Sequence, residues 1–227
     1  MNQLTWEDIN KKEKRYIRKI SYEETKPFLL GIHYARRMPC ITHAFGLFLE
    51  GKCVGVVTYG IPPSNSLCKG LAGQENFHNV LELNRLVFLP EYNGNNNASY
   101  LVSHSLKMLP NKTFVVSYAD TAWSHVGYIY QATNFLYTGM SAKRLDTYQP
   151  EGKHPRAYNK DNHDKRYQTR SPKHRYVYLV GDKRTRKQMR KELKYPVVTP
   201  YPKGDETRYD IKNPKIIVPI KIIDKNK

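Results

Sequence analysis

The chain has 227 residues, enough to bury one good core or one core with an appendage. Its 38 Lys and Arg residues against 20 Asp and Glu give a formal net charge of +18. This excess favours a polyanionic partner, because each phosphate contact releases counterions from a nucleic acid. The cysteines, Cys40, Cys53 and Cys68, form no Cys-x-x-Cys pair, which argues against a zinc ribbon and a disulfide framework. No apolar run is long enough to span a bilayer and no signal-type core opens the chain, so we expect a cytoplasmic protein with no membrane partner.

The first third of the chain predicts strands around one helix. Glu24 or Thr25 is expected to cap the helix, whose first turn accepts Pro27 and which Pro39 closes. The segment 61–79, rich in Pro, Gly, Ser and Asn, is predicted to be a loop beside the active face. The predicted strands are Arg15–Ile20, His43–Leu49 and Lys52–Tyr59, the last two joined in a hairpin at Glu50-Gly51.

The stretch from Glu82 to Gly139 is the most informative. An alternating apolar strand, Leu83–Phe88, leads into Glu91–Asn97, whose residues tolerate left-handed backbone angles. Such a loop can turn several N–H groups toward one phosphate, and the following helix, about 99–109 and capped by Asn97 or Ser99, would add its positive end. The elements predicted next are the strand Thr113–Tyr118, the helix 122–133 and the strand Phe135–Tyr137.

The rest of the chain is basic and less regular. Residues 141–173 lack a periodic pattern, and we interpret them as a nucleic-acid-facing loop, with simple disorder as the alternative. A last strand is predicted at Arg175–Val180. The basic helix Lys183–Leu193 fits a solvated face as well as a phosphate-contacting one. We expect one domain over 1–227, with its core at about 15–193 and an extended tail over 194–227.

The order strand, phosphate-type loop, helix, strand, helix, strand is that of the acyl-CoA-binding half of the GNAT acetyltransferase fold. Three segments, Leu83–Val87, Ser117–Asp120 and His125–Phe135, together resemble the phage Mom family, GNAT-like proteins that modify adenine in phage DNA. The resemblance covers roughly 31–139. It implies an α/β (α+β) fold, a mixed central sheet flanked by helices. GNAT loops usually carry spaced glycines, whereas only Gly94 stands in this one.

The resemblance also implies a set of site residues. His33, Tyr34 and Asp120 match positions proposed to hold iron, and imidazole, phenolate and carboxylate are suitable ligands for that metal. The same three residues and Tyr130 are the catalytic candidates, with Asp120 placed to orient or deprotonate an amine. The plain alternatives are an ordinary helix histidine for His33, a helix N-cap for Asp120 and a core ring for Tyr130.

Two further groups of candidates concern the donor and the DNA. Asn84 and Arg85 alternate along their strand, so only one of them is expected to face the cleft; Arg85 suits a phosphate or carboxylate, or else a structural salt bridge. The cofactor-binding candidates are Asn84, Arg85, Gly94 and Ser99. The candidates for the DNA backbone are Arg36, Arg37, Lys143 and Arg144.

The function that the resemblance implies is hypermodification of adenine N6 in double-stranded DNA by a carbamoylmethyl group, which would protect phage DNA from restriction. The donor stays open between acetyl-CoA and another acyl- or aminoacyl-derived group. Two alternatives remain: a conventional acetyl-CoA-dependent GNAT enzyme acting on a protein, RNA or small-molecule amine, and a DNA-binding protein without activity. The sequence does not decide between a monomer and a homodimer.

Overall fold

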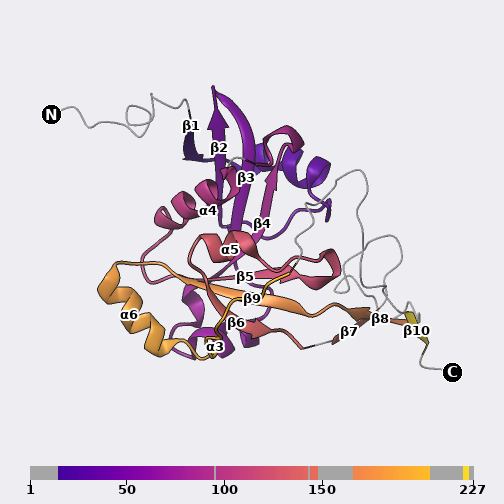
Figure 1. Cartoon of the computed structure of the whole chain (residues 1–227), viewed down its shortest axis with the longest axis vertical. Helices are drawn as coiled ribbons and strands as arrows, with labels where there is room; N and C mark the ends of the chain where they lie inside the picture. Colours follow the sequence, from indigo (N-terminus) through magenta and orange to yellow (C-terminus); the bar gives the residue numbers. More distant parts are fainter. Residues whose placement is uncertain (1–14, 95, 143, 148–165, 205–221, 225–227) are drawn as a thin grey trace.

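The computed structural model describes residues 15–94, 96–142, 144–147, 166–204 and 222–224. Its main layer is a seven-stranded sheet of order β1-β2-β3-β4-β5-β9-β6, in which only the β4–β5 pair is parallel (Figure 1). The strands are β1 (Arg15–Lys19), β2 (His43–Leu49), β3 (Lys52–Gly60), β4 (Val80–Phe88), β5 (Phe114–Asp120), β6 (Leu136–Met140) and β9 (Lys173–Leu179).

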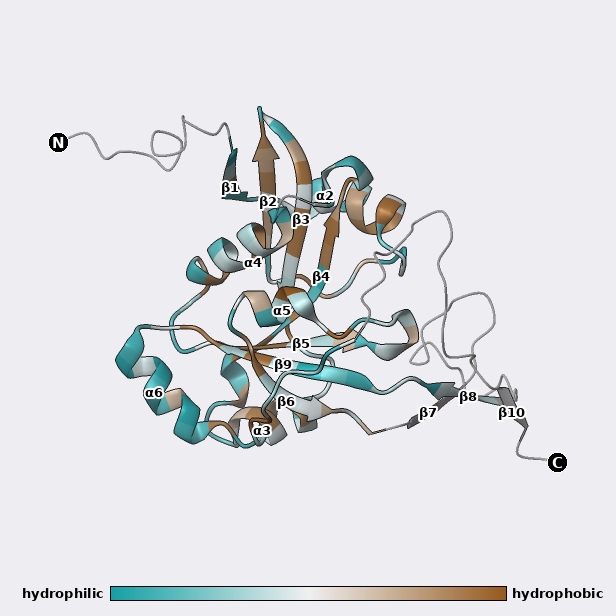
Figure 2. Ribbon diagram, viewed as in Figure 1, coloured by the Kyte–Doolittle hydropathy of each residue, from teal (hydrophilic) through white to brown (hydrophobic). Residues whose placement is uncertain are grey.

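Helices cover both faces of this sheet. Leu81 and Leu83 of β4 pack with Leu101 on one face, which α4 and α5 cover. Val80 packs with α3 and α6 on the other face, and Val87 packs there with η1. The hydrophobic residues concentrate in β2, β3 and β4, whereas α6 is largely hydrophilic (Figure 2). This confirms the mixed α/β sheet flanked by helices. The helices are α2 (Tyr22–Lys26), the π-helical η1 (Pro27–Ile32), α3 (Asn65–Ala72), α4 (Asn97–Lys107), α5 (Tyr128–Ala132) and α6 (Lys183–Glu192), with short 3-10 turns η2 (Phe77–Asn79), η3 (Pro90–Tyr92) and η4 (Thr121–Trp123).

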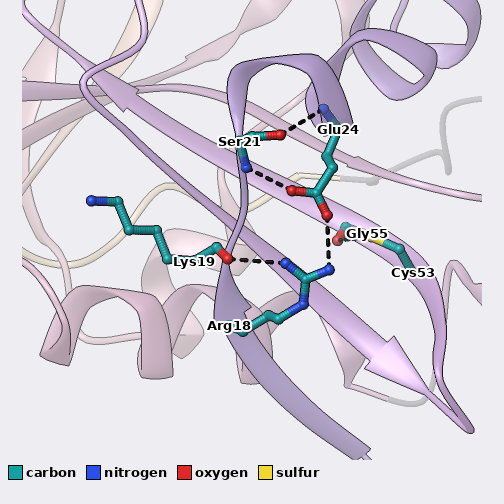
Figure 3. Close-up of polar contacts among 6 residues, drawn as sticks. All are labelled: Arg18, Lys19, Ser21, Glu24, Cys53 and Gly55. Atoms are coloured by element: carbon teal, nitrogen blue, oxygen red, sulfur yellow. Dashed lines mark hydrogen bonds and ion pairs between the residues drawn. The ribbon is translucent and has the colours of Figure 1, made fainter.

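The first helix starts earlier than predicted. The Ser21 hydroxyl accepts a hydrogen bond from Glu24 N at 3.3 Å, and the Glu24 carboxylate accepts one from Ser21 N at 2.8 Å, a capping box (Figure 3). Arg18 also binds that carboxylate at 2.8 Å. Ser21 is therefore the cap, and the prediction of Glu24 or Thr25 was wrong by one turn.

Two other predictions about helices need correction. The segment 61–79, predicted to be a loop, contains α3, because Ser64 caps it and Leu71 gives it a buried face. The helix predicted at 122–133 is broken, since Ser124 and Gly127 have left-handed backbones with φ of 55° and 84°. Only α5 remains of it.

A second, three-stranded sheet takes two strands from the segment predicted to be a loop, 141–173, and one from the predicted tail. Its order is β10-β8-β7, and both pairs are antiparallel. The periodic pattern of apolar residues is weak there, so the pairing between strands is what identifies them. The strands are β7 (Arg144–Thr147), β8 (Arg166–Arg170) and β10 (Ile222–Asp224). Residues 148–165 and most of the predicted tail, 205–221, lie outside the described residues.

The start of the tail packs in an extended form along β6 and α5. Val198 N donates to Tyr137 O at 2.9 Å, Tyr201 Oη donates to Phe135 O at 2.6 Å, and Gln131 Nε2 donates to Pro202 O at 3.0 Å. Within the described residues, no helix combines the length and the apolarity that crossing a membrane requires.

Candidate active site

The site begins where two strands of the sheet separate. β4 and β5 pair in parallel only over Val80–Glu82 with Phe114–Val116. Beyond Glu82, β4 follows β3 and β5 follows β9, so the sheet opens. A cleft of about 1250 Å³ fills this opening. It lies at the carboxyl ends of the parallel strands, where open α/β sheets bind their ligands.

The cleft reaches both faces of the sheet. From the α4–α5 face it is lined by Ala98, Ile129 and Tyr130. From the other face it is lined by residues after η1, by the start of α3 and by β9. Because the opening passes between the strands, two ligands can approach one another through it from opposite faces.

A β-bulge shapes the wall formed by β4. Thr58 pairs with Arg85 and Tyr59 pairs with Leu83, so Asn84 is the extra residue. Its amide Oδ1 accepts from Thr58 Oγ1 at 2.6 Å, and its Nδ2 donates to Cys40 O at 2.8 Å. Asn84 therefore lies on the same face as Arg85, and the expectation that only one of them faces the cleft was wrong.

Next to this wall lie His33 and Tyr34, which follow the end of η1. Their rings are 4.3 Å apart between centroids, and both line the cleft. His33 is buried, and its Nδ1 accepts a hydrogen bond from Ala35 N at 3.1 Å. Burial, reinforced by Arg85 and Arg37, lowers the pKa of His33 to about 3. The imidazole is thus neutral, with its proton on Nε2.

Glu82 is a cleft residue that the sequence prediction missed. It is the last residue of β4 to pair with β5, it is half-buried, and it lines the cleft. Burial raises the pKa of its carboxyl group, against the opposing effects of Arg85, Lys173 and Arg170. The available signal was an acidic residue inside an apolar strand, a position that such a residue rarely occupies without a reason.

Tyr130 lines the opposite side of the opening, on α5. Burial raises the pKa of its phenol to about 12, and the Ser117 hydroxyl that hydrogen-bonds it acts in the other direction. Ser117 is held in turn by Leu83 O at 2.9 Å. Tyr130 also packs on Phe135 and Tyr176, so it is both a core ring and a cleft residue.

Asp120 ends β5 beside the cleft rather than among the residues that line it. It accepts from Ala122 N at 3.0 Å as the N-cap of η4, from the Ser171 hydroxyl, and from Lys173 Nζ at 2.6 Å. Burial raises its pKa, but Lys173 and these hydrogen bonds outweigh burial, and the net shift is downward. Asp120 is a poor base and a firm anchor for the turn that carries Trp123.

The arrangement of these residues does not fit an iron site. Ala35 N–H occupies the lone pair of His33 Nδ1, so binding a metal through Nε2 would require a proton facing that N–H. Lys173 and Ser171 already bind the carboxylate of Asp120. Among the described residues, no group of three His, Cys, Asp or Glu side chains is placed to hold a metal ion.

The phosphate-type loop is less open than predicted. The amides of Tyr92, Asn93, Gly94 and Asn97 donate to carbonyl groups within the loop. The helix begins at Asn97, after Asn96 at φ 58°, two residues earlier than predicted, and Asn96 makes no side-chain cap. The Ser99 hydroxyl donates to Asn96 O at 3.0 Å. Asn84 and Arg85 line the cleft, whereas Gly94 and Ser99 are not among its lining residues, although their neighbours Asn93 and Ala98 are.

The predicted DNA contacts are partly placed. Arg36 and Arg37 are exposed in the segment that follows His33 and Tyr34. Arg144 begins β7, and Lys143 lies outside the described residues. Near them, the ring of Tyr34, 43% exposed, lies 5.2 Å from that of Trp123 between centroids, and this aromatic pair was not predicted.

Comparisons with known proteins match most of the chain. A model described as the Mom protein family matches residues 14–203. The methylcarbamoylase mom of Escherichia phage Mu is 26% identical over 188 residues, which are 75% of this chain and 76% of that protein. Two solved structures are similar in fold alone. The ribosomal-protein-S18-alanine N-acetyltransferase from Escherichia coli has a TM-score of 0.45 and 10% identity over 74% of this chain and 95% of its own. A GNAT-family acetyltransferase from Bacillus cereus has a TM-score of 0.44 and 14% identity over 74% and 99%.

Proposed function

We propose, since this chain belongs to the Mom protein family, that it is a phage DNA-modification enzyme that attaches a carbamoylmethyl group to N6 of adenine. The relative from phage Mu is named a methylcarbamoylase, which supports transfer of a group of this kind. The modified DNA would resist the restriction nucleases of the host, in whose cytoplasm the enzyme would act.

The observation that carries this proposal is the cleft that passes through the sheet. A donor can lie on the α4–α5 face, near Ala98 and Tyr130, while the acceptor base enters from the face of η1 and α3. The acceptor face carries Arg170 and Lys173, which suit the phosphates of the same nucleotide. The candidates for the donor are acetyl-CoA and another acyl- or aminoacyl-derived group.

Adenine N6 is hidden in a stacked duplex, so the base has to be extruded before it reacts. Extrusion costs a few kcal/mol, which stacking on aromatic rings and backbone contacts offset. The exposed ring of Tyr34 beside Trp123 is a stacking surface at the entrance of the acceptor face. Arg36 and Arg37, in the same segment as Tyr34, would hold the backbone next to the extruded nucleotide.

Three side chains have roles that follow from their protonation state and charge in the folded protein. His33 stays neutral and donates from Nε2, so it can hold an acceptor atom of the purine. Tyr130 stays protonated at neutral pH and can donate to the leaving group of the donor. Arg85, whose buried Nε has no acceptor among the described residues, supplies positive charge for an anionic part of the donor or substrate.

Mass spectrometry of nucleosides tests the proposal. DNA from cells that express the chain should contain an adenosine species heavier by a carbamoylmethyl group. Tyr130→Phe should lower its amount by about 100-fold, the scale of one lost proton-donating group, while the exposed Lys107→Gln should leave it unchanged. A parent that yields only unmodified adenosine would refute the proposal, and an acetylated adenosine would instead support the conventional acetyl-transfer alternative.

A further inference from the structure

Glu82 has a place in the cleft that no role proposed above explains. Its neighbours in the β4–β5 pair, Val80 and Leu81, are buried core residues on opposite faces of the sheet. A carboxylate in the next position of the same strand is costly to bury unless it is paired. Among the described residues, no hydrogen bond or ion pair within 4.0 Å is found for the side-chain carboxylate of Glu82.

The side chain of Glu82 points to the acceptor face. Residues two apart along a strand share a face, and Val80 packs with α3 and α6. Glu82 therefore faces the same side as the residues after η1, and the bulge begins only two positions later, at Asn84. The carboxylate stands at the apex of the opening, where the acceptor face meets the passage to Tyr130.

The charges around Glu82 come from every element that surrounds it. The pKa of Glu82 is lowered by the charges of Arg85 of β4, Lys173 of β9 and Arg170 of β8. The charge of Glu82 in turn raises the pKa of Cys68 of α3 and of Tyr130 of α5. Burial raises the pKa of the Glu82 carboxyl group and so makes its carboxylate a stronger base than an exposed one, while Arg85, Lys173 and Arg170 oppose that shift. Asp120, by contrast, is bound by Lys173 and has a lowered pKa.

We propose that Glu82 is the general base that takes the proton from the attacking amine, an inference that rests on the proposed function. The amine nitrogen forms a bond to the methylene carbon of the donor, the carbon that becomes the CH2 of the carbamoylmethyl group. The bond from that carbon to its leaving group breaks, and the electron pair departs with the leaving group. One N–H proton of the amine passes to a carboxylate oxygen of Glu82, which later releases it to water.

The structure also explains why a base is needed at this point. The lone pair of an exocyclic amine is delocalised into the purine ring, so the nitrogen becomes strongly acidic as it forms the new bond. A carboxylate within reach of that proton removes the developing positive charge, a contribution of about 100- to 10,000-fold in rate. Arg85 and Lys173 on either side would otherwise repel that charge.

The test compares initial rates of nucleoside modification in lysates of cells expressing the full chain, with plasmid DNA added as the acceptor. Glu82→Gln keeps the shape of the side chain and should lower the rate by at least about 100-fold. Glu75→Gln, at an exposed glutamate just after α3, is the matched control and should retain the parent rate. Thermal unfolding and retention on plasmid DNA should be the same for both variants, which excludes loss of folding or binding as the cause.

Chemical rescue separates a base from a structural carboxylate. In Glu82→Ala lysates, added formate should restore part of the rate, because a small carboxylate can occupy the space and accept the proton. Parent-like modification by Glu82→Gln would overturn the assignment of Glu82 while leaving the proposed function standing. A parent lysate that produces no modified adenosine would instead overturn the proposed function. If Glu82→Ala does not fold, the Glu82→Gln rate alone decides.

Discussion

At the scale of single residues, hydrogen bonds decide what the predicted site can do. His33 and Asp120 were both predicted as metal ligands from the family resemblance, but Ala35 N–H occupies Nδ1 of His33, and Ala122 N and Lys173 bind the carboxylate of Asp120. Glu82, which no motif contained, has no such partner among the described residues and faces the acceptor side of the cleft. Residue type alone does not separate these cases, because the difference lies in which backbone and side-chain groups each one meets after folding.

The neutral state of His33 leads to a prediction about acid. Its pKa in the folded chain, about 3, is below the usual 6.5, so the folded state resists the proton. The contribution of this neutral imidazole to the free energy of unfolding is fully present above pH 6.5 and is lost as the pH falls from 6.5 toward 3. Two-dimensional NMR of the ring nitrogens should show the Nε2–H tautomer from pH 8 to pH 5.

The same spectra test the metal question. Ferric iron at an equimolar amount should leave the His33 ring signals as sharp as those of His78, an exposed histidine on η2. Selective broadening of His33 and Tyr34 would show that both reorganise around the ion. A pH-dependent movement of the His33 signals centred near 6.5 would contradict the buried, neutral ring.

At the scale of elements, the break between η4 and α5 places Tyr130. Gly127 precedes α5 with φ of 84°, and a Cβ there would lie 2.5 Å from the ring of Tyr176 and 3.0 Å from that of Tyr130. Gly127→Ala should therefore lower the free energy of unfolding by about 1–3 kcal/mol, through backbone strain and overpacking. It should also displace Tyr130 and reduce modification.

Gly31→Ala is the matched control, because no atom lies within 4 Å of a Cβ at Gly31 and its backbone φ is not positive. Urea unfolding of the two variants measures the difference. Equal unfolding midpoints for Gly127→Ala and the parent would show that the turn tolerates a side chain and that α5 is not held by it.

The elements that the sequence predicts well are those with buried, alternating apolar residues. The strand at Leu83–Phe88 and the helix beginning near Ser99 are examples, because each has one face in the core. The helix predicted at 122–133 fails since its apolar spacing is helical, while Gly127 and Ser124 take left-handed conformations that spacing does not report. The strands β7 and β8 carry little apolar pattern at all, and only their pairing reveals them.

The residues of the site likewise separate into those that the local sequence predicts and those that depend on the folded structure. His33 and Tyr34 are predicted beside a helix end, and the π-helical η1 does end at Ile32, just before them. The bulge at Asn84 was not predictable, because an extra residue depends on the register of the partner strand. Gln131, in the resembling segment His125–Phe135, ties α5 to Tyr176 at 3.1 Å and to Pro202, so it holds the tail against the fold rather than a ligand.

At the scale of the whole molecule, the net charge of +18 is spread over many basic residues and would attract the DNA substrate that we propose. Most of the exposed basic residues, including those of α6, would add a uniform attraction that is independent of sequence. Arg36 and Arg37 differ because they lie beside the acceptor entrance, in the segment of Tyr34. Phosphate contacts made there would position an extruded nucleotide as well as attract the duplex.

This difference gives the last prediction, on the salt dependence of binding. The logarithm of the affinity for duplex DNA falls with the logarithm of salt concentration by about 0.9 for each phosphate contact. The double variant Arg36→Gln, Arg37→Gln should make this slope shallower by about 2, measured by fluorescence anisotropy from low to physiological salt. Modification of adenine should fall by more than binding does, because the lost contacts also hold the extruded base.

Lys107→Gln, Lys112→Gln removes two exposed charges at the other end of α4, remote from the residues that line the cleft. It changes the net charge by the same amount as the arginine variant, so a contribution from charge alone would affect both equally. If the two double variants lose affinity and modification in the same proportion, the DNA is held by the overall field of the protein. If only the arginine variant shows the shallower slope and the larger loss of modification, the DNA backbone crosses the acceptor entrance, and the extruded adenine then has Tyr34 as its first contact with the cleft.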